Sequence, residues 1–237
     1  MYRVEDSHWW YQGMASITRT ILNRGYPSRQ NLRILDAGCG TGAAMTTYLA
    51  EYGNVTGIDL YSQALDFCRK RNASRLARAS VLNLPFASAS FDLITSFDVL
   101  YERAVPSDIT ALQEFARILS PSGRVLLRLP AYDWLRGQHD KQVHTGKRYT
   151  IPLVKELFKV SGLILEHISY ANTFLFPIAV IKRISEKIFP PKETTSDLTL
   201  KAGIFNKLLQ NILAAEAPLV ANTGLPYGLS VVAIGRK

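Results

Sequence analysis

The stretch LDAGCGTG at residues 35–42 decides the fold. An apolar segment at residues 32–35 leads into it, and a segment with helical periodicity at residues 42–52 follows it. Glycine at every second position lets the backbone turn sharply and come close to a ligand, and free amides at the helix start favour an anionic group. The G-x-G-x-G spacing differs from the G-x-G-x-x-G of dinucleotide-binding loops. The glycines that we expect to contact a ligand are Gly38, Gly40 and Gly42.

Two acidic residues belong to the same expected site. Asp59 ends the next apolar segment, where a carboxylate can accept hydrogen bonds from both hydroxyls of a ribose. The structural alternative for Asp59 is to cap the helix that follows. Asp36 precedes the first glycine by two positions, and we expect it near an amino group of a cofactor, partly through water. Its structural alternative is to brace the glycine loop.

Outward from this loop, apolar segments alternate with helical patterns, which predicts a parallel sheet with helices on both faces. We expect a Rossmann-like α/β core over residues 31–170, preceded by an aromatic segment and helix at 1–30. A helical cap at 171–226 interrupts the pattern before the last core strand at 227–237. The expected strands lie at residues 32–35, 54–58, 79–82, 91–97, 124–129, 163–169 and 229–234. The expected helices lie at residues 14–24, 42–52, 62–72 (with Ser62 as its N-cap), 107–119, 151–160, 178–189 and 204–220.

Composition limits the class of protein. The chain has 237 residues, 47% of them hydrophobic and 20% charged, which fits a soluble globular protein and excludes a disordered or collagen-like chain. We expect a cytoplasmic protein, since no apolar run reaches membrane-spanning length and the N-terminus lacks the pattern of a signal peptide. Cys39 and Cys68 are too far apart in sequence to suggest a metal site. The net charge of +9 suits an anionic partner, although the basic residues are scattered.

Together, the glycine loop, Asp59, and the stretches ASVLNLPF at 79–86 and SFDLI at 90–94 resemble the class I S-adenosylmethionine-dependent methyltransferases. The resemblance covers roughly residues 30–130 plus the last strand. It implies a seven-stranded sheet whose final strand is antiparallel, and S-adenosylmethionine as cofactor. It also places Leu60 on the adenine face, Val81 in main-chain contact with the adenine, and Phe97 against the methionine part through its backbone. Ser80 stands where many members carry Asp.

The acceptor is less defined. The stretch SFDVLYE at 96–102 lacks the Asn/Asp-Pro-Pro-aromatic tetrad of nucleic-acid amino-methyltransferases, which favours a small-molecule acceptor. A loop at 139–149 follows the fifth strand, and we expect His139, or with less support His144, to act as a general base. An ordinary polar loop is the alternative. We expect Arg148 to bind an anionic group of the acceptor, or else to cap the next helix. The same two alternatives hold for Tyr149, and we also expect Tyr101 to contact the acceptor.

Two further segments are expected near the acceptor. Trp9, Trp10 and Tyr11 either form a lid over cofactor and acceptor or anchor the first helix as a hydrophobic staple. The apolar stripes of the 171–226 segment predict an acceptor cap, with peripheral membrane contact as the alternative. We therefore predict methylation of a small, partly apolar metabolite, aromatic or otherwise hydrophobic, at oxygen. Methylation at carbon or nitrogen is the first alternative, and an RNA methyltransferase or a non-catalytic cofactor-binding protein are the others. We expect no nucleic-acid partner, and the sequence leaves the oligomeric state open.

Overall fold

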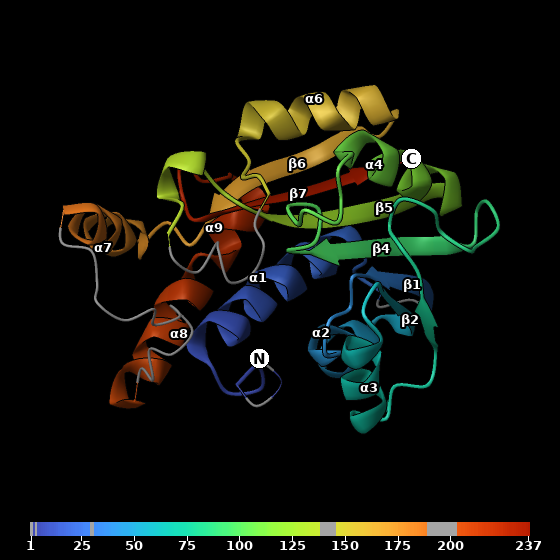
Figure 1. The fold of residues 1–237 in the computed structure, drawn as a ribbon, viewed down its shortest axis with the longest axis horizontal. Helices are drawn as coiled ribbons and strands as arrows, with labels where there is room; N and C mark the ends of the chain where they lie inside the picture. The colour runs from blue at the N-terminus through green and yellow to red at the C-terminus, as the bar shows by residue number, and fades with distance from the viewer. Residues whose placement is uncertain (1, 3, 29–30, 138–145, 189–202) are drawn as a thin grey trace.

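A computed structural model describes residues 2, 4–28, 31–137, 146–188 and 203–237. Its centre is a seven-stranded sheet in the order β3-β2-β1-β4-β5-β7-β6 (Figure 1). Strand β7 is antiparallel to both of its neighbours, and the other strand pairs are parallel. The predicted Rossmann-like sheet with an antiparallel last strand is therefore confirmed. The strands are β1 (Leu32–Ala37), β2 (Gly53–Asp59), β3 (Leu76–Arg78), β4 (Phe91–Phe97), β5 (Leu119–Pro130), β6 (Ile164–Ala171) and β7 (Ser230–Arg236).

Helices cover both faces because neighbouring residues of each strand point to opposite sides. Leu35 and Ile94 pack with α4 (Asp108–Ile118) and α6 (Ile151–Ser161). Ile34 and Leu93 pack with α1 (Trp9–Gly25) on the other face. Both neighbours in each pair are completely buried, so the sheet is sandwiched between two apolar layers, as is usual for parallel sheets. The remaining helices before residue 75 are α2 (Ala43–Thr47), η1 (Leu49–Glu51) and α3 (Ser62–Lys70).

The segment between β6 and β7 is helical, as its apolar stripes predicted. It contains α7 (Phe176–Ile188), η4 (Gly203–Phe205), α8 (Asn206–Ala215) and α9 (Ala217–Asn222). Helix α8 packs closely on α1 at Gly13, where a Cβ atom would come within 2.6 Å of the Leu213 side chain. Helix α7 lies at the left-hand end of the molecule in Figure 1. Among the described residues, no helix is both long and apolar enough to span a membrane.

Three local predictions were wrong. Strand β3 covers Leu76–Arg78, whereas we expected it at 79–82; those residues turn instead, because Ser80 Oγ accepts a hydrogen bond from Leu82 N at 3.2 Å. Tyr61 is the N-cap of α3, and Ser62 is already helical. Helix α1 begins at Trp9 rather than Met14, because His8 Nδ1 accepts a hydrogen bond from Trp10 N at 3.3 Å and caps the helix.

Candidate functional site

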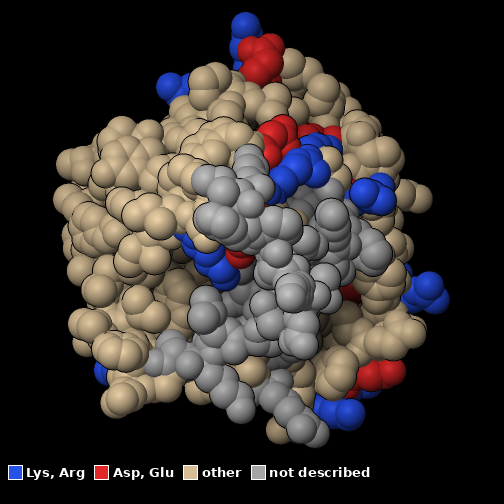
Figure 2. Space-filling model, turned by 60° about the vertical axis from the view of Figure 1, so that its left-hand side comes forward, with Lys and Arg blue, Asp and Glu red and all other residues tan. Residues whose placement is uncertain are grey.

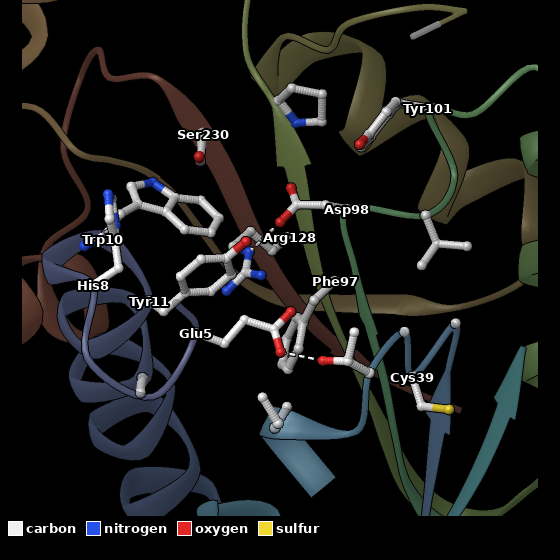
Figure 3. Close-up of a pocket in the computed structure, with 18 of the residues that line it drawn as sticks. Glu5, His8, Trp10, Tyr11, Cys39, Phe97, Asp98, Tyr101, Arg128 and Ser230 are labelled. Atoms are coloured by element: carbon white, nitrogen blue, oxygen red, sulfur yellow. Dashed lines mark hydrogen bonds and ion pairs between the residues drawn. The ribbon is translucent and has the colours of Figure 1, made fainter. Parts of the chain in front are cut away.

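A cavity of about 1450 Å³ lies at the carboxyl ends of the parallel strands, between the glycine loop and the helices α1, α7 and α8 (Figure 3). The fold explains this position, because strand ends and the loops after them meet at one edge of a parallel sheet. Thirteen of the seventeen predicted site residues line the cavity, namely Trp9, Trp10, Tyr11, Asp36, Gly38, Gly40, Asp59, Leu60, Ser80, Val81, Phe97, Tyr101 and Arg148.

 Of the other four, Gly42 and Tyr149 do not line the cavity, and His139 and His144 lie outside the described residues.

The glycine loop has the backbone that its sequence predicted. Gly38, Gly40 and Gly42 have φ angles of +84°, +54° and +81°, a region that favours glycine. At Gly40 a Cβ atom would meet no protein atom within 4 Å, and Gly40 lines the cavity. At Gly42 a Cβ atom would instead lie 3.0 Å from Cys68 Sγ, so this glycine allows the loop to pack on α3. The loop therefore leaves room for a ligand beside Gly40.

Two carboxylates hold this end of the cavity together. Asp36 is 2% exposed and accepts a hydrogen bond from Thr95 Oγ1 at 2.8 Å, and burial raises its pKa to about 6. Asp59 accepts hydrogen bonds from Gly40 N at 3.0 Å and from Tyr61 N at 2.9 Å, so it braces the loop while it lines the cavity. Burial also raises the pKa of Asp59. Both side chains are placed to face a polar or cationic ligand.

The predicted acceptor residues divide into two groups. Trp9, Trp10, Tyr11, Tyr101 and Arg148 line the cavity, with Trp10 and Tyr11 pointing into it from α1 (Figure 3).

Tyr149, in contrast, is completely buried in the core, and its hydroxyl donates a hydrogen bond to Asp108 Oδ1 at 3.1 Å. Burial, together with the charge of Asp108, raises the pKa of this hydroxyl above its ordinary value. The structure thus gives Tyr149 a place in the core below the cavity rather than in its wall.

The floor of the cavity contains an ion pair that the sequence analysis did not single out. Arg128, on β5, is 9% exposed, and its Nε lies 2.7 Å from Asp98 Oδ2. Its guanidinium carbon lies 4.9 Å from the ring centroid of Trp10 and 4.8 Å from that of Phe97. These contacts join α1 to the ends of β4 and β5 (Figure 3). The sequence does carry a signal for Arg128, because a basic residue inside an apolar strand, two residues before Pro130, is unusual.

Three more titratable side chains in the wall were also missed. Glu102 lies in the loop after β4, and burial, reinforced by the charge of Asp59, raises its pKa to about 7. Glu5 is 6% exposed and receives a hydrogen bond from the hydroxyl of Thr41. His8 Nε2 is buried without a hydrogen-bond partner among the described residues, and burial lowers the pKa of this imidazole. Such an atom in a cavity wall is available to a ligand.

The two ends of the cavity differ in chemistry. The end at the glycine loop carries the carboxylates of Glu5, Asp36, Asp59 and Glu102. The other end is lined by apolar side chains of α7 and α8 and the turns before them, with basic residues among them. The residues at this end are Leu175, Ile178, Lys182, Arg183, Phe205, Leu208 and Leu209. On the face of the molecule in Figure 2, the coloured basic side chains are interspersed with acidic ones and do not form a continuous basic surface.

Comparison with known proteins agrees with this geometry. A family model described as a methyltransferase domain matches residues 35–127. The demethylmenaquinone methyltransferase of Staphylococcus aureus (strain MRSA252) is 30% identical over 162 residues, which cover 63% of this chain and 63% of that protein. The chain therefore spans less than two thirds of the length of this relative.

Solved structures show the same fold. An S-adenosylmethionine-dependent methyltransferase from Mesorhizobium loti superposes with a TM-score of 0.58 at 18% identity, covering 91% of this chain and 95% of the other. A geranyl diphosphate methyltransferase in complex with S-adenosylmethionine superposes with a TM-score of 0.63 at 14% identity, covering 95% of this chain and 85% of the other.

Residues 35–127 thus match a methyltransferase domain, and the glycine loop and sheet order are those of the class I S-adenosylmethionine-dependent methyltransferase fold. S-adenosylmethionine is the expected cofactor. The residues present fit this molecule, because it carries cationic groups and a ribose, and the glycine-loop end of the cavity offers carboxylates and an open glycine backbone.

Proposed function

We propose that the protein transfers a methyl group from S-adenosylmethionine to an oxygen atom of a small, partly apolar acceptor. The observation that carries this proposal is a single cavity that joins the acidic glycine-loop end to an apolar end. The relative from Staphylococcus aureus, whose name gives demethylmenaquinone as its acceptor, supports a small-molecule acceptor. S-adenosylmethionine would supply an electrophilic methyl group on a positively charged sulfur.

The chain's own residues would hold and orient the two reactants. Asp59 would accept hydrogen bonds from the ribose, and Leu60 and Val81 would pack beside the adenine. Ser80 Oγ, which accepts a hydrogen bond from Leu82 N, would accept a second one from the adenine amino group. Trp10, Phe97 and the apolar wall of α7 and α8 would exclude water and hold the acceptor in line, which is the main contribution that we expect to the rate.

Removal of the acceptor's proton requires a base. His139, and after it His144, remain our prediction, and the residues that bracket them support it. Gly146 N donates a hydrogen bond to Tyr101 O at 2.7 Å, and Arg136 Nη2 donates to Gly146 O at 2.8 Å. Gly146, the first described residue after the two histidines, is thus tied to the wall of the cavity at Tyr101. Glu102, next to Tyr101, is the second candidate, because its pKa of about 7 suits proton transfer near neutral pH.

The segment at 171–226 would act as the acceptor cap, and the aromatic residues of 1–30 as a lid. Support comes from α7 and α8, which contribute the apolar end of the cavity, and from Trp9, whose amide donates a hydrogen bond to Asn206 Oδ1 at 2.9 Å. A hydrogen bond therefore joins the two segments that we propose as lid and cap.

Cofactor binding is the first test. Titration calorimetry should show S-adenosylmethionine binding to the wild type, and Asp59→Ala should weaken it by about 2–3 kcal/mol through the loss of a charged acceptor. Unchanged affinity in this variant would contradict the ribose assignment. Turnover with candidate phenols and hydroxylated metabolites then tests the acceptor class, and methylation of RNA alone would overturn it.

A further inference from the structure

The N-terminal segment at residues 4–8 reaches across to the glycine loop. Glu5 receives a hydrogen bond from the hydroxyl of Thr41, the residue between Gly40 and Gly42. The side chain of Glu5 is 6% exposed and points from the N-terminal segment toward the same part of the cavity as Phe97 (Figure 3). A segment far from the loop in sequence therefore places a carboxylate directly beside it.

Arg71, just after α3, fastens this segment from the outside. Its Nη1 lies 2.8 Å and 2.9 Å from the two carboxylate oxygens of Asp6, and its Nη2 lies 3.5 Å from Glu5 Oε2. The guanidinium also lies 4.8 Å from the ring centroid of Tyr2, which stacks on Phe67 with a centroid distance of 4.9 Å. The segment is thus held on α3 by both charge and ring contacts.

A buried carboxylate is costly unless it is closely paired, and Glu5 has a long ion pair with Arg71. Arg71 makes its close contacts with Asp6 and stays at 3.5 Å from Glu5. The carboxylate of Glu5 lines the cavity together with Asp36 and Phe97, on the side of the glycine loop. A cation in that part of the cavity would complete the pairing.

We propose that Glu5 is a cofactor-binding residue that pairs with the ammonium group of S-adenosylmethionine, so that residues 4–8 close over the amino-acid end of the cofactor. The inference rests on the proposed function for the identity of the ligand. The adenosine end is assigned to Asp59, Leu60 and Val81, which leaves the amino-acid end for the region between Thr41 and Phe97. Glu5 and the adenosine-binding residues would then act on different parts of one ligand.

Glu5→Gln tests this division with three ligands in titration calorimetry: S-adenosylmethionine, S-adenosylhomocysteine and methylthioadenosine. The first two carry the ammonium group, and the third lacks the amino-acid part. We expect affinity for the first two to fall roughly tenfold or more, as for loss of a charged hydrogen bond, and affinity for methylthioadenosine to stay the same. Glu166→Gln is the matched control. This carboxylate pairs with Arg124 at 2.7 Å, and it lies on the edge strand β6, outside the cavity wall.

The outcomes separate the inference from the proposed function. If the wild type binds none of the three ligands, the proposed function fails. If the wild type binds them and Glu5→Gln binds all three equally well, only the role of Glu5 is overturned. A loss for S-adenosylmethionine without a loss for S-adenosylhomocysteine would also overturn it, because the charge would then face the sulfonium.

Arg71→Gln tests the fastening of the segment without changing Glu5. We expect faster proteolytic cleavage of the N-terminal segment, and protection by S-adenosylhomocysteine that is weaker than in the wild type. Arg69→Gln is the control, since Arg69 pairs only locally with Asp66 at 2.6 Å and both side chains are more than 60% exposed. Equal cleavage of the two variants would show that Arg71 does not hold the segment.

Discussion

The two ends of the cavity are built in different ways. The glycine-loop end comes from short stretches at the ends of neighbouring strands, and its contacts are largely hydrogen bonds to backbone groups, such as those between Asp59 and the amides of Gly40 and Tyr61. The other end comes from α1, α7 and α8, of which α1 and α8 are far apart in sequence and meet through side-chain packing. Backbone geometry fixes the first end, so few sequences can build it. Side-chain packing fixes the second end, so many sequences can build it.

The largest expected effect is at Gly40. Gly40→Val should abolish measurable cofactor binding, because a branched side chain would enter the space beside the loop and its φ of +54° disfavours side chains. Calorimetry measures the binding, and circular dichroism checks that the fold is kept.

Gly162→Val is the matched control for this change. Gly162 has a φ of +80°, also has open space around a Cβ atom, and ends α6 outside the cavity wall. It should lose stability, by about 1–2 kcal/mol, with cofactor affinity unchanged. Equal cofactor affinity in both valine variants would contradict the role of the glycine loop.

His139→Ala should lower turnover by about 10²–10⁴-fold with cofactor affinity unchanged, as expected for loss of a general base. His144→Ala should have a smaller effect. The measurement is kcat on a genuine acceptor as a function of pH, with Glu102→Gln alongside. If kcat loses its pH dependence near 7 only in Glu102→Gln, the general base is Glu102. Wild-type turnover in all three variants would favour an acceptor that is already nucleophilic at carbon or nitrogen.

These predictions also show which parts of the molecule the sequence determines. The sheet and the glycine loop could be predicted, because alternating strands and helices and three spaced glycines are local signals, and the antiparallel last strand followed from the resemblance to the methyltransferase family. Glu5 and Arg128 could not, because their roles depend on contacts with Thr41 and Asp98 in other segments. Tyr149 shows the opposite case: it is polar and is the last residue of the predicted 139–149 loop, yet the core encloses it.

Asp36→Asn should separate stability from cofactor binding. The pKa of Asp36 is about 6 in the folded protein, above its ordinary value of 3.8, so the ionised side chain destabilises the fold. This destabilisation grows as the pH rises from about 4 to about 6 and reaches about 2–3 kcal/mol above that range. Asparagine keeps an acceptor for Thr95, so urea unfolding at pH 7.5 should show higher stability.

The same substitution should weaken cofactor binding about tenfold through loss of the negative charge. In the wild type, affinity should fall as the pH drops through about 6, because Asp36 takes up a proton. An identical pH dependence of affinity in Asp36→Asn would show that another group is responsible.

At the apolar end, Ile178→Asn should raise the KM for the acceptor roughly tenfold, since a bound acceptor would cover this side chain and burying an aliphatic side chain is worth about 1.5–3 kcal/mol. The side chain of Ile178 lines the cavity from α7. Ile181→Asn is the control, because Ile181 is 68% exposed on the same helix, against 65% for Ile178, and lies outside the cavity wall. Cofactor affinity should stay the same in both, and equal KM values would contradict the acceptor cap.

The smallest effect is expected for Tyr149→Phe. The variant loses the hydrogen bond to Asp108 Oδ1 and keeps the buried ring, so stability should fall by about 1 kcal/mol. Asp108 retains its ion pair with Lys147, which limits the loss. Because Tyr149 lies below the cavity wall, the KM for the acceptor should not change, whereas Tyr101→Phe, in the wall itself, should change it. A raised KM in Tyr149→Phe, with Tyr101→Phe unaffected, would mean that the acceptor reaches past the wall into what the structure shows as core.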